Sequence, residues 1–210
     1  MKIIGIVGSP RTGGNSFCLV NEALAAAREA ESSTETEIIQ LGDFRIQPCK
    51  ACETCGQFPF KCVQSDDFEI VLDKMKEADA VLIASPRYGP FGASPSILQA
   101  LLERLMNVSY LPKHTDPGFI PPLKGKPCGL VAVSVEGRQN LLPVLHSLEQ
   151  YVLAYGMRVV HTSEWPYVGV AGRGNAPGDV LEDEDAMKAA RTLGRLMVRW
   201  AKMRTLWKDS

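Results

Sequence analysis

The sequence predicts a doubly wound α/β domain, in which one parallel sheet of five strands carries helices on both faces. Short apolar runs alternate along the chain with segments whose apolar residues recur at helical spacing. Nearly continuous apolar runs are typical of strands buried on both faces, and right-handed crossovers place the intervening helices on both sides of the sheet. The 210 residues, 45% of them hydrophobic, are enough for one good core, so we predict a single domain over residues 1–210.

The first half of the chain predicts two strands and two helices around an irregular segment. The expected elements are a strand at 2–7, a helix at 17–30, a strand at 36–41 and a helix at 66–78. The run "KIIGIV" is apolar almost throughout, and "FCLVNEALAAAREA" has helical spacing. Asp66 with Glu69 three residues later resembles a helix N-cap signal. Residues 42–65 carry no periodic pattern and contain four cysteines.

The second half repeats the alternation. The expected elements are a strand at 79–85, a helix at 95–106, a strand at 128–135, a helix at 140–156, a strand at 157–165 and a helix at about 182–208. Pro143 fits only the first turn of its helix. A Pro- and Gly-rich insertion, "LPKHTDPGFIPPLKGKP", precedes the fourth strand, and we expect it to be an interface or lid loop.

Charge and hydropathy exclude some classes of partner. The net charge of -1 is close to balance, so we expect no nucleic-acid partner. No apolar run approaches the roughly 20 residues that a membrane helix needs. The N-terminal "MKIIGIVGSP" lacks a cleavage-site pattern, so we expect no signal peptide and a cytoplasmic protein.

The first strand is followed by "GSPRTGGNS", which is poor material for a strand or a helix. It does not contain the G-x-G-x-x-G fingerprint of dinucleotide-binding proteins. Gly8 and Gly13 have the separation of a P-loop, but Gly14 stands where its lysine would be. A dinucleotide or a nucleoside triphosphate is therefore not the expected ligand.

A terminal monophosphate suits this loop better. Small polar side chains and a cation, from Ser9, Arg11, Thr12, Asn15 and Ser16, accompany glycines that let the backbone approach closely. The helix that follows presents unpaired N–H groups and the positive end of its dipole. The simpler alternative is a glycine turn with Asn15 or Ser16 as an ordinary cap, which leaves the other donors unexplained.

Two further loops should face the same ligand, because they follow the third and fourth strands of the parallel sheet. In "SPRYGPFG", Pro86, Tyr88 and Gly89 are suited to lie along a flat aromatic ring. In "SVEGRQN", Gly137 would allow close backbone contact with the edge of that ring.

The stretches "GSPRTGGNS", "PCKACETCGQFPFKCVQSDDF" and "SPRYGPFGASPSILQALLER" resemble the NADPH-dependent FMN reductase superfamily, and more narrowly its iron–sulfur flavoprotein branch. The likeness runs from Lys2 to about Gly156. It implies a flavodoxin-like fold with strand order 2-1-3-4-5 and FMN as cofactor. It also implies that Ser9, Arg11, Asn15 and Ser16 hold the FMN phosphate.

The resemblance assigns the remaining contacts, those to the isoalloxazine and ribityl parts of FMN, to the second and third loops. The full set of expected cofactor-binding residues is Ser9, Arg11, Thr12, Gly14, Asn15, Ser16, Pro86, Arg87, Tyr88, Gly89, Ser134, Glu136 and Gly137. We expect no catalytic acid or nucleophile, because the three histidines are scattered and pair with no such motif.

The cysteines divide into two groups. Cys18 and Cys128 are expected to be buried apolar residues. Four others are spaced C-x2-C-x2-C-x6-C, which supplies the four thiolates of a [4Fe–4S] cluster: Cys49, Cys52, Cys55 and Cys62. A metal centre would also order the long irregular segment that carries them. Zinc remains an alternative, although structural zinc usually draws two separated pairs. A chain without native metal is the third possibility.

Three functions follow from these alternatives. The first is an electron-transfer flavoprotein that links a one-electron carrier to FMN through a cluster, because the cofactors supply the chemistry and the protein their orientation. The second is an NAD(P)H-dependent FMN or quinone reductase without a cluster, and the third a zinc-stapled nucleotide-binding module. The resemblance implies a ferredoxin-like or nicotinamide donor, a quinone, flavin or oxygen-species acceptor, and a homodimer or homotetramer.

Overall fold

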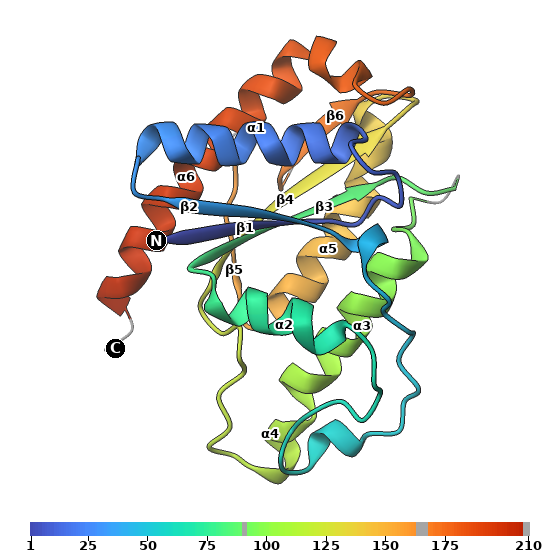
Figure 1. Ribbon diagram of the computed structural model, residues 1–210, viewed down its shortest axis with the longest axis vertical. Coiled ribbons are helices and arrows are strands. Elements are labelled where there is room, and N and C mark those ends of the chain that lie inside the picture. Colours follow the sequence, from blue (N-terminus) through green and yellow to red (C-terminus); the bar gives the residue numbers. More distant parts are fainter. Residues whose placement is uncertain (90–91, 163–167, 208–210) are drawn as a thin grey trace.

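A parallel sheet forms the centre of the computed structural model, which describes residues 1–89, 92–162 and 168–207 (Figure 1). Its main strands are β1 (Lys2–Val7), β2 (Glu35–Gln40), β3 (Ala80–Pro86), β4 (Pro127–Ser134) and β5 (Arg158–Val159). All pair in parallel, in the order β2-β1-β3-β4-β5. This confirms the predicted fold class and strand order.

The edge of the sheet next to β4 differs from the prediction. Its single fifth strand, expected over residues 157–165, ends at Val159, and residues 163–165 lie outside the described part of the chain. A sixth strand, β6 (Val170–Arg173), pairs in parallel with the carboxyl half of β4, while β5 pairs only with its first two residues. The short run "VGVAG" is apolar enough to cover β4, whose eight residues are all buried. The prediction treated that run as part of a loop.

Helices cover both faces of the sheet (Figure 1). On one face lie α1 (Asn15–Ala30) and α6 (Glu184–Trp207), and on the other α2 (Phe68–Glu77), α3 (Ser96–Tyr110) and α5 (Leu142–Ala154). Pro143 stands in the first turn of α5, as predicted. Among the described residues, no helix has the length and apolar character needed to cross a membrane.

Two hydrophobic cores result from the alternation of side chains along each strand. In β1, Ile3 and Val7 pack with the α1 and α6 side, whereas Ile4 and Ile6 pack with α2, α3 and α5. All four are completely buried, and burying such a side chain stabilises the fold by about 1.5–3 kcal/mol. This double burial explains why the strands are apolar runs rather than alternating patterns.

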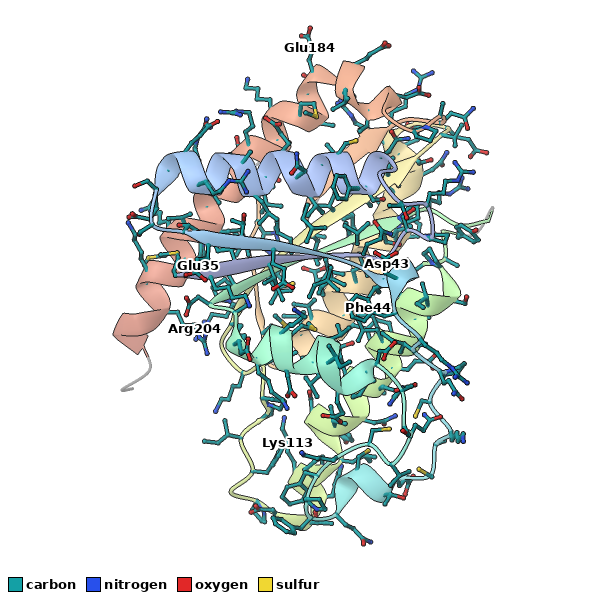
Figure 2. The ribbon with its side chains drawn as sticks, in the orientation of Figure 1. Glu35, Asp43, Phe44, Lys113, Glu184 and Arg204 are labelled. Atoms are coloured by element: carbon teal, nitrogen blue, oxygen red, sulfur yellow. The ribbon has the colours of Figure 1, made fainter. Side chains whose placement is uncertain are left out.

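The cysteine-bearing segment between β2 and α2 is irregular except for two short 3-10 turns, at Leu41–Asp43 and Thr54–Gly56. Figure 2 shows Asp43 and Phe44 where this segment leaves the sheet, and Lys113 far from Glu184 at the start of α6. The Pro-rich insertion contains α4 (Pro112–Thr115) and packs against the cysteine segment.

Two contacts join the insertion to the cysteine segment. The Thr115 hydroxyl donates to the Gly56 carbonyl. The rings of Phe60 and Phe119 meet edge to face, with centroids 5.1 Å apart. In the described structure, therefore, the insertion supports the cysteine segment. The prediction of an interface or lid loop did not anticipate this packing.

Candidate functional site

A cavity of about 140 Å³ lies at the carboxyl ends of the central strands, between the loops that follow β1, β3, β4 and β6. Its lining residues are Ser9, Pro10, Arg11, Gly14, Asn15, Ser16, Pro86, Arg87, Tyr88, Val133, Ser134, Val135, Gly174, Asn175 and Pro177. Nine of the thirteen predicted cofactor-binding residues are among them. Thr12, Gly89, Glu136 and Gly137 do not line this cavity.

The first turn of α1 forms one wall of this cavity. Gly14 occupies the N-cap position, no side chain caps the helix, and its first turn contains no acidic residue. The Ser16 hydroxyl is buried and has no hydrogen-bond partner among the described residues. A buried hydroxyl without a partner is unfavourable, and a phosphate at the free N–H groups of this turn would satisfy it. The site therefore fits the phosphate end of a flavin mononucleotide.

The loop that leads into α1 is held by hydrogen bonds between side chains and its backbone. The Ser9 hydroxyl accepts the Arg11 N–H at 3.1 Å, and the Gln40 side chain donates to the Ser9 carbonyl. Gly13 has a φ of 66°, a conformation that favours glycine. Arg11 is exposed and donates through Nη1 to the Asn175 carbonyl at 3.4 Å. Its guanidinium thus remains beside the cavity.

The Asn15 side chain joins the start of α1 to the loop after β6. Its Oδ1 accepts the N–H groups of Gly178 at 3.0 Å and Val180 at 3.2 Å, and its Nδ2 donates to the Ala176 carbonyl at 2.9 Å. The side-chain amide is therefore occupied by the loop after β6. Asn15 lines the cavity, and its side chain ties that loop to α1. Its contact with a phosphate stays a prediction.

The loop after β3 forms the second wall. The Arg87 N–H donates to the Val133 carbonyl at 2.7 Å, which fixes the loop to β4. Tyr88 exchanges two backbone hydrogen bonds with Ala93, so this turn is closed at its base. The Tyr88 side chain is 53% exposed and lines the cavity, where its ring is available to a flat ligand.

The loop after β4 contributes less than predicted. Ser134 lines the cavity, and its hydroxyl accepts the Glu136 N–H at 3.1 Å. The Glu136 carboxylate accepts a hydrogen bond from Arg87 Nη1 at 2.8 Å and another from the Asn140 side-chain amide. Gly137, with a φ of 116°, lines a neighbouring cavity of about 870 Å³ instead. The two expected flavin contacts at Glu136 and Gly137 are therefore absent from the lining of the smaller cavity.

The loop after β6 supplies residues that the sequence interpretation missed: Gly174, Asn175 and Pro177. The approach to α1 is close here, since a Cβ on Gly174 would lie 2.7 Å from Asn15 Nδ2. The available signal was "GRGNAPG", a run of small and turn-forming residues like those of the other strand-end loops. It could not be recognised without the strand that precedes it.

A second cavity, of about 80 Å³, is lined by all four clustered cysteines, Cys49, Cys52, Cys55 and Cys62. It lies at the end of α3 remote from the loop after β3 (Figure 1). All six cysteines are free thiols, and Cys128 is fully buried as predicted, whereas Cys18 is only partly buried. All four cysteine residues therefore line one space, although the chain around them is irregular.

Hydrogen-bond donors surround these sulfurs. Asn107 Nδ2 donates to Cys49 Sγ at 3.1 Å, and the Ala51 N–H donates to the same sulfur at 3.4 Å. A hydrogen bond from Thr54 lowers the pKa of Cys52, whereas burial raises the pKa of Cys55. Donors to sulfur favour the thiolate that metal binding requires.

Arg104 on α3 also lines this cavity and is only 1% exposed. Its Nη1 lies 2.6 Å from Asp66 Oδ2, and its guanidinium lies 4.1 Å from the centre of the Phe68 ring. Burial opposes ionisation of Asp66, but hydrogen bonds from Arg104 and from backbone N–H groups outweigh it, so the Asp66 pKa is lowered. Burial also lowers the Arg104 pKa, but the Asp66 carboxylate and the neighbouring Cys62 thiol reverse that effect and raise it.

The sequence interpretation missed Arg104 and predicted Asp66 as the N-cap of a helix. The N-cap of α2 is Asp67, not the predicted Asp66. Asp66 accepts the Phe68 N–H at 3.2 Å through Oδ1, while its other oxygen pairs with Arg104. The only signal in the sequence was one arginine within the apolar helical run "ILQALLERLM". Nothing local connects that residue with the cysteine segment, which ends about 40 positions earlier.

A parallel sheet in the order 2-1-3-4-5, with helices on both faces and a cavity at the carboxyl ends of its central strands, defines the flavodoxin-like class. A family model described as NADPH-dependent FMN reductase matches residues 1–170. The chain belongs to this family, in its iron–sulfur flavoprotein branch, and is a flavin-dependent oxidoreductase.

Individual relatives agree with this assignment. The chain is 36% identical over 204 residues to an iron–sulfur flavoprotein of Methanocaldococcus jannaschii, covering 97% of this chain and 98% of that one. It is 29% identical over 208 residues to an iron–sulfur flavoprotein of Archaeoglobus fulgidus, with 96% of each chain covered. The structure of an NAD(P)H:acceptor oxidoreductase from Paracoccus denitrificans has a TM-score of 0.61 at 19% identity, with 97% and 98% covered, and shares the fold.

Proposed function

We propose that this protein is an FMN-containing electron-transfer flavoprotein whose cysteine segment binds a [4Fe–4S] cluster. The observation that carries the proposal is the convergence of Cys49, Cys52, Cys55 and Cys62 on one cavity in a chain that also has a phosphate site for the flavin. When bound, FMN exchanges one or two electrons and a cluster exchanges one, so the pair joins one-electron and two-electron partners.

The residues of the first cavity suit FMN as follows. The N–H groups at the start of α1, the Ser16 hydroxyl and the Arg11 guanidinium hold the phosphate, as charge-assisted donors do. Pro86 and Tyr88 lie along the ring, and Ser134 is available to the ribityl chain. The lining described for this cavity contains no histidine, cysteine or carboxylate side chain, which suits electron transfer without a protein acid.

The spacing of the cysteines favours a cluster over zinc. The run C-x2-C-x2-C-x6-C resembles the compact cysteine runs that hold iron–sulfur clusters, whereas structural zinc usually draws its cysteines as two separated pairs. All four cysteines line one cavity, and four thiolates are the number that a [4Fe–4S] cluster needs.

We further propose a ferredoxin-like or nicotinamide donor, and a quinone, flavin or oxygen species as the acceptor. The cysteine cavity opens near Cys52, which is exposed and gives a one-electron carrier a place of close approach. A homodimer or homotetramer remains part of the proposal, as the family resemblance implies.

A second candidate function, an NAD(P)H-dependent reductase without a cluster, is favoured by one observation. The cavity of about 870 Å³ shares Val135, Gly174 and Asn175 with the flavin cavity. It therefore has room for a nicotinamide nucleotide beside the flavin. Its wall carries two cations, Arg138 and Arg173, together with the carboxylates of Asp179, Glu182 and Asp183. Arg138 is already paired with Asp183, so the phosphates of such a ligand would compete with that pair.

Anaerobic purification, a visible spectrum and an iron and sulfide assay test the proposal. We expect flavin absorbance together with broad brown absorbance that bleaches on reduction, and equal amounts of iron and sulfide. Replacing Cys49 or Cys55 with serine should abolish the iron but leave the flavin. Cys18→Ser, outside the cysteine cavity, is the matched control and should keep both.

Two results would change the proposal. A protein with flavin but no iron or sulfide would overturn the cluster and leave the NAD(P)H-dependent reductase, which anaerobic bleaching of the flavin by NADPH would then test. A colourless protein that cannot be reconstituted with FMN would overturn both functions.

A further inference from the structure

We propose that the buried Arg104–Asp66 pair sets the reduction potential of the cluster, with Arg104 Nε and Nη2 donating hydrogen bonds to the sulfur atoms in the cysteine cavity. This inference rests on the proposed cluster and assigns a positioning residue and its partner to that site. It is independent of the identity of the electron donor and acceptor.

The guanidinium of Arg104 is fixed on one side. Its Nη1 donates to Asp66 Oδ2 at 2.6 Å and lies 3.3 Å from the Gln47 carbonyl. The Phe68 ring covers the guanidinium at 4.1 Å. With its side chain 1% exposed and that of Asp66 0% exposed, the pair has no freedom to turn toward solvent.

The other side of the guanidinium has donors without acceptors. Nε and Nη2 are buried and have no hydrogen-bond partner in the part of the chain that the structure describes. Such donors are rare in folded proteins and call for a ligand or an unusual function. Arg104 lines the cysteine cavity, where the available acceptors are the sulfurs gathered there and the buried, unpartnered Gln64 Oε1. A cluster would add its own sulfur atoms to these acceptors.

Charge gives the direction of the effect. One-electron reduction adds a negative charge in the cavity, and a buried cation beside it stabilises the reduced state more than the oxidised one. The Asp66 carboxylate opposes this, because it brings a negative charge to the same buried pair. Lys50 and Glu53 also line the cavity, but both are exposed, so solvent and salt screen them.

These opposed charges predict shifts of opposite sign. Arg104→Gln removes the cation and should move the reduction potential of the cluster to more negative values. We expect at least a tenfold change in the one-electron reduction equilibrium, which corresponds to about 59 mV. Asp66→Asn leaves the guanidinium without its counter-charge and should move the potential to more positive values. Arg104→Lys keeps the charge and should lie between wild type and Arg104→Gln. If the Arg104–Asp66 pair only stabilised the fold, the two substitutions would not shift the reduction potential in opposite directions.

The experiment is a redox titration of anaerobically purified holoprotein, with the reduced cluster followed by electron paramagnetic resonance. Iron and sulfide are assayed in every sample. Iron-replete Arg104→Gln with the wild-type potential would overturn the inference and leave the proposed function intact. If Arg104→Gln loses its iron, the potential of Asp66→Asn decides, since an unchanged or more negative value would overturn the inference. Wild-type protein without iron would overturn the proposed function itself, and the inference with it.

Discussion

The Asn15 side chain accepts the backbone N–H of Gly178 at 3.0 Å, across 163 positions of sequence. The same oxygen accepts the Val180 N–H, so one amide joins the start of α1 to the loop after β6. This contact closes one end of the cavity at the start of α1, where we propose that the FMN phosphate binds, with residues from the carboxyl-terminal part of the chain.

Substitution of Asn15 separates its loop-holding effect from any phosphate contact. Asn15→Ala leaves two partly buried N–H groups without their acceptor and should lower the free energy of unfolding by about 1–3 kcal/mol. Asn15→Asp keeps an acceptor oxygen but places a negative charge at the phosphate site, so it should retain more stability and bind FMN more weakly than wild type. Urea unfolding of the apoprotein and FMN titration measure the two effects. FMN affinity equal to wild type in Asn15→Asp would place the phosphate elsewhere.

Removing the Ser16 hydroxyl should affect the two forms of the protein differently. Its oxygen is buried without a partner in the described apoprotein, so Ser16→Ala should leave the thermal midpoint of the apoprotein unchanged or higher. The holoprotein should lose a hydrogen bond to a charged group, about 1.5–3 kcal/mol of FMN affinity. Calorimetry of both forms and FMN titration check this. Equal FMN affinity in the variant would contradict the predicted contact.

Arg11 should contribute charge to the same site. Arg11→Ala is expected to weaken FMN binding by about 1.5–3 kcal/mol, because a charge-assisted contact to the phosphate is lost. Arg28→Ala is the matched control, since Arg28 lies in the last turn of α1, far from the loop that carries Arg11, and its replacement removes the same charge. Fluorescence titration with FMN and with riboflavin, which lacks the phosphate, isolates the effect. A loss that is equal for both ligands would count against a phosphate contact.

Asn107 should retain the metal in the cysteine cavity. Its Nδ2 donates to Cys49 Sγ at 3.1 Å, and losing such an outer hydrogen bond typically weakens metal binding 10–100-fold. Asn107→Leu should therefore release iron to a chelator about 10–100 times faster than wild type. Glu103→Gln, on the same helix but outside the cavity lining, is the control. Identical release rates in Asn107→Leu and wild type would contradict the prediction.

Glu37 on β2 should make stability depend on pH in the acid range. Its hydrogen bond with Lys74 lowers the Glu37 pKa, and Lys2 lies 3.2 Å away. A lowered folded pKa means stability that is present above the unfolded value of about 4.3 and lost as the pH falls through the folded value. Glu37→Gln should thus be less stable than wild type by about 0.5–1 kcal/mol at pH 7.

This difference between wild type and Glu37→Gln should disappear in more acidic solution, at a pH below the folded Glu37 pKa. Urea unfolding at both pH values measures it. Glu35→Gln, an exposed residue at the start of the same strand (Figure 2), removes the same charge as a control. A Glu37→Gln deficit that persists unchanged in acid would show that the ion pair is not its cause.

Most elements of the sheet and its helices could be predicted, because strands buried on both faces and amphipathic helices have strong local patterns, whereas the strand order came from the family resemblance. The strand "KIIGIV" and the loop "GSPRTGGNS" can be predicted from neighbouring residues alone. The spacing of the four cysteines likewise predicts a set of metal ligands without any knowledge of the fold. The short strand β6 was not predicted, since four residues carry too little pattern and pair only through β4.

By itself, the sequence determined the fold class, the position of the first strand–helix turn and the grouping of the four cysteines. Each of these depends on patterns among residues that are close together in the chain. Only the tertiary structure decided that Asn15 holds the loop after β6, that Glu136 pairs with Arg87, and that Arg104 faces the cysteine cavity. Each of these pairings joins residues about 40 to 165 positions apart. Their geometry follows from how the helices pack on the sheet, which no local pattern specifies.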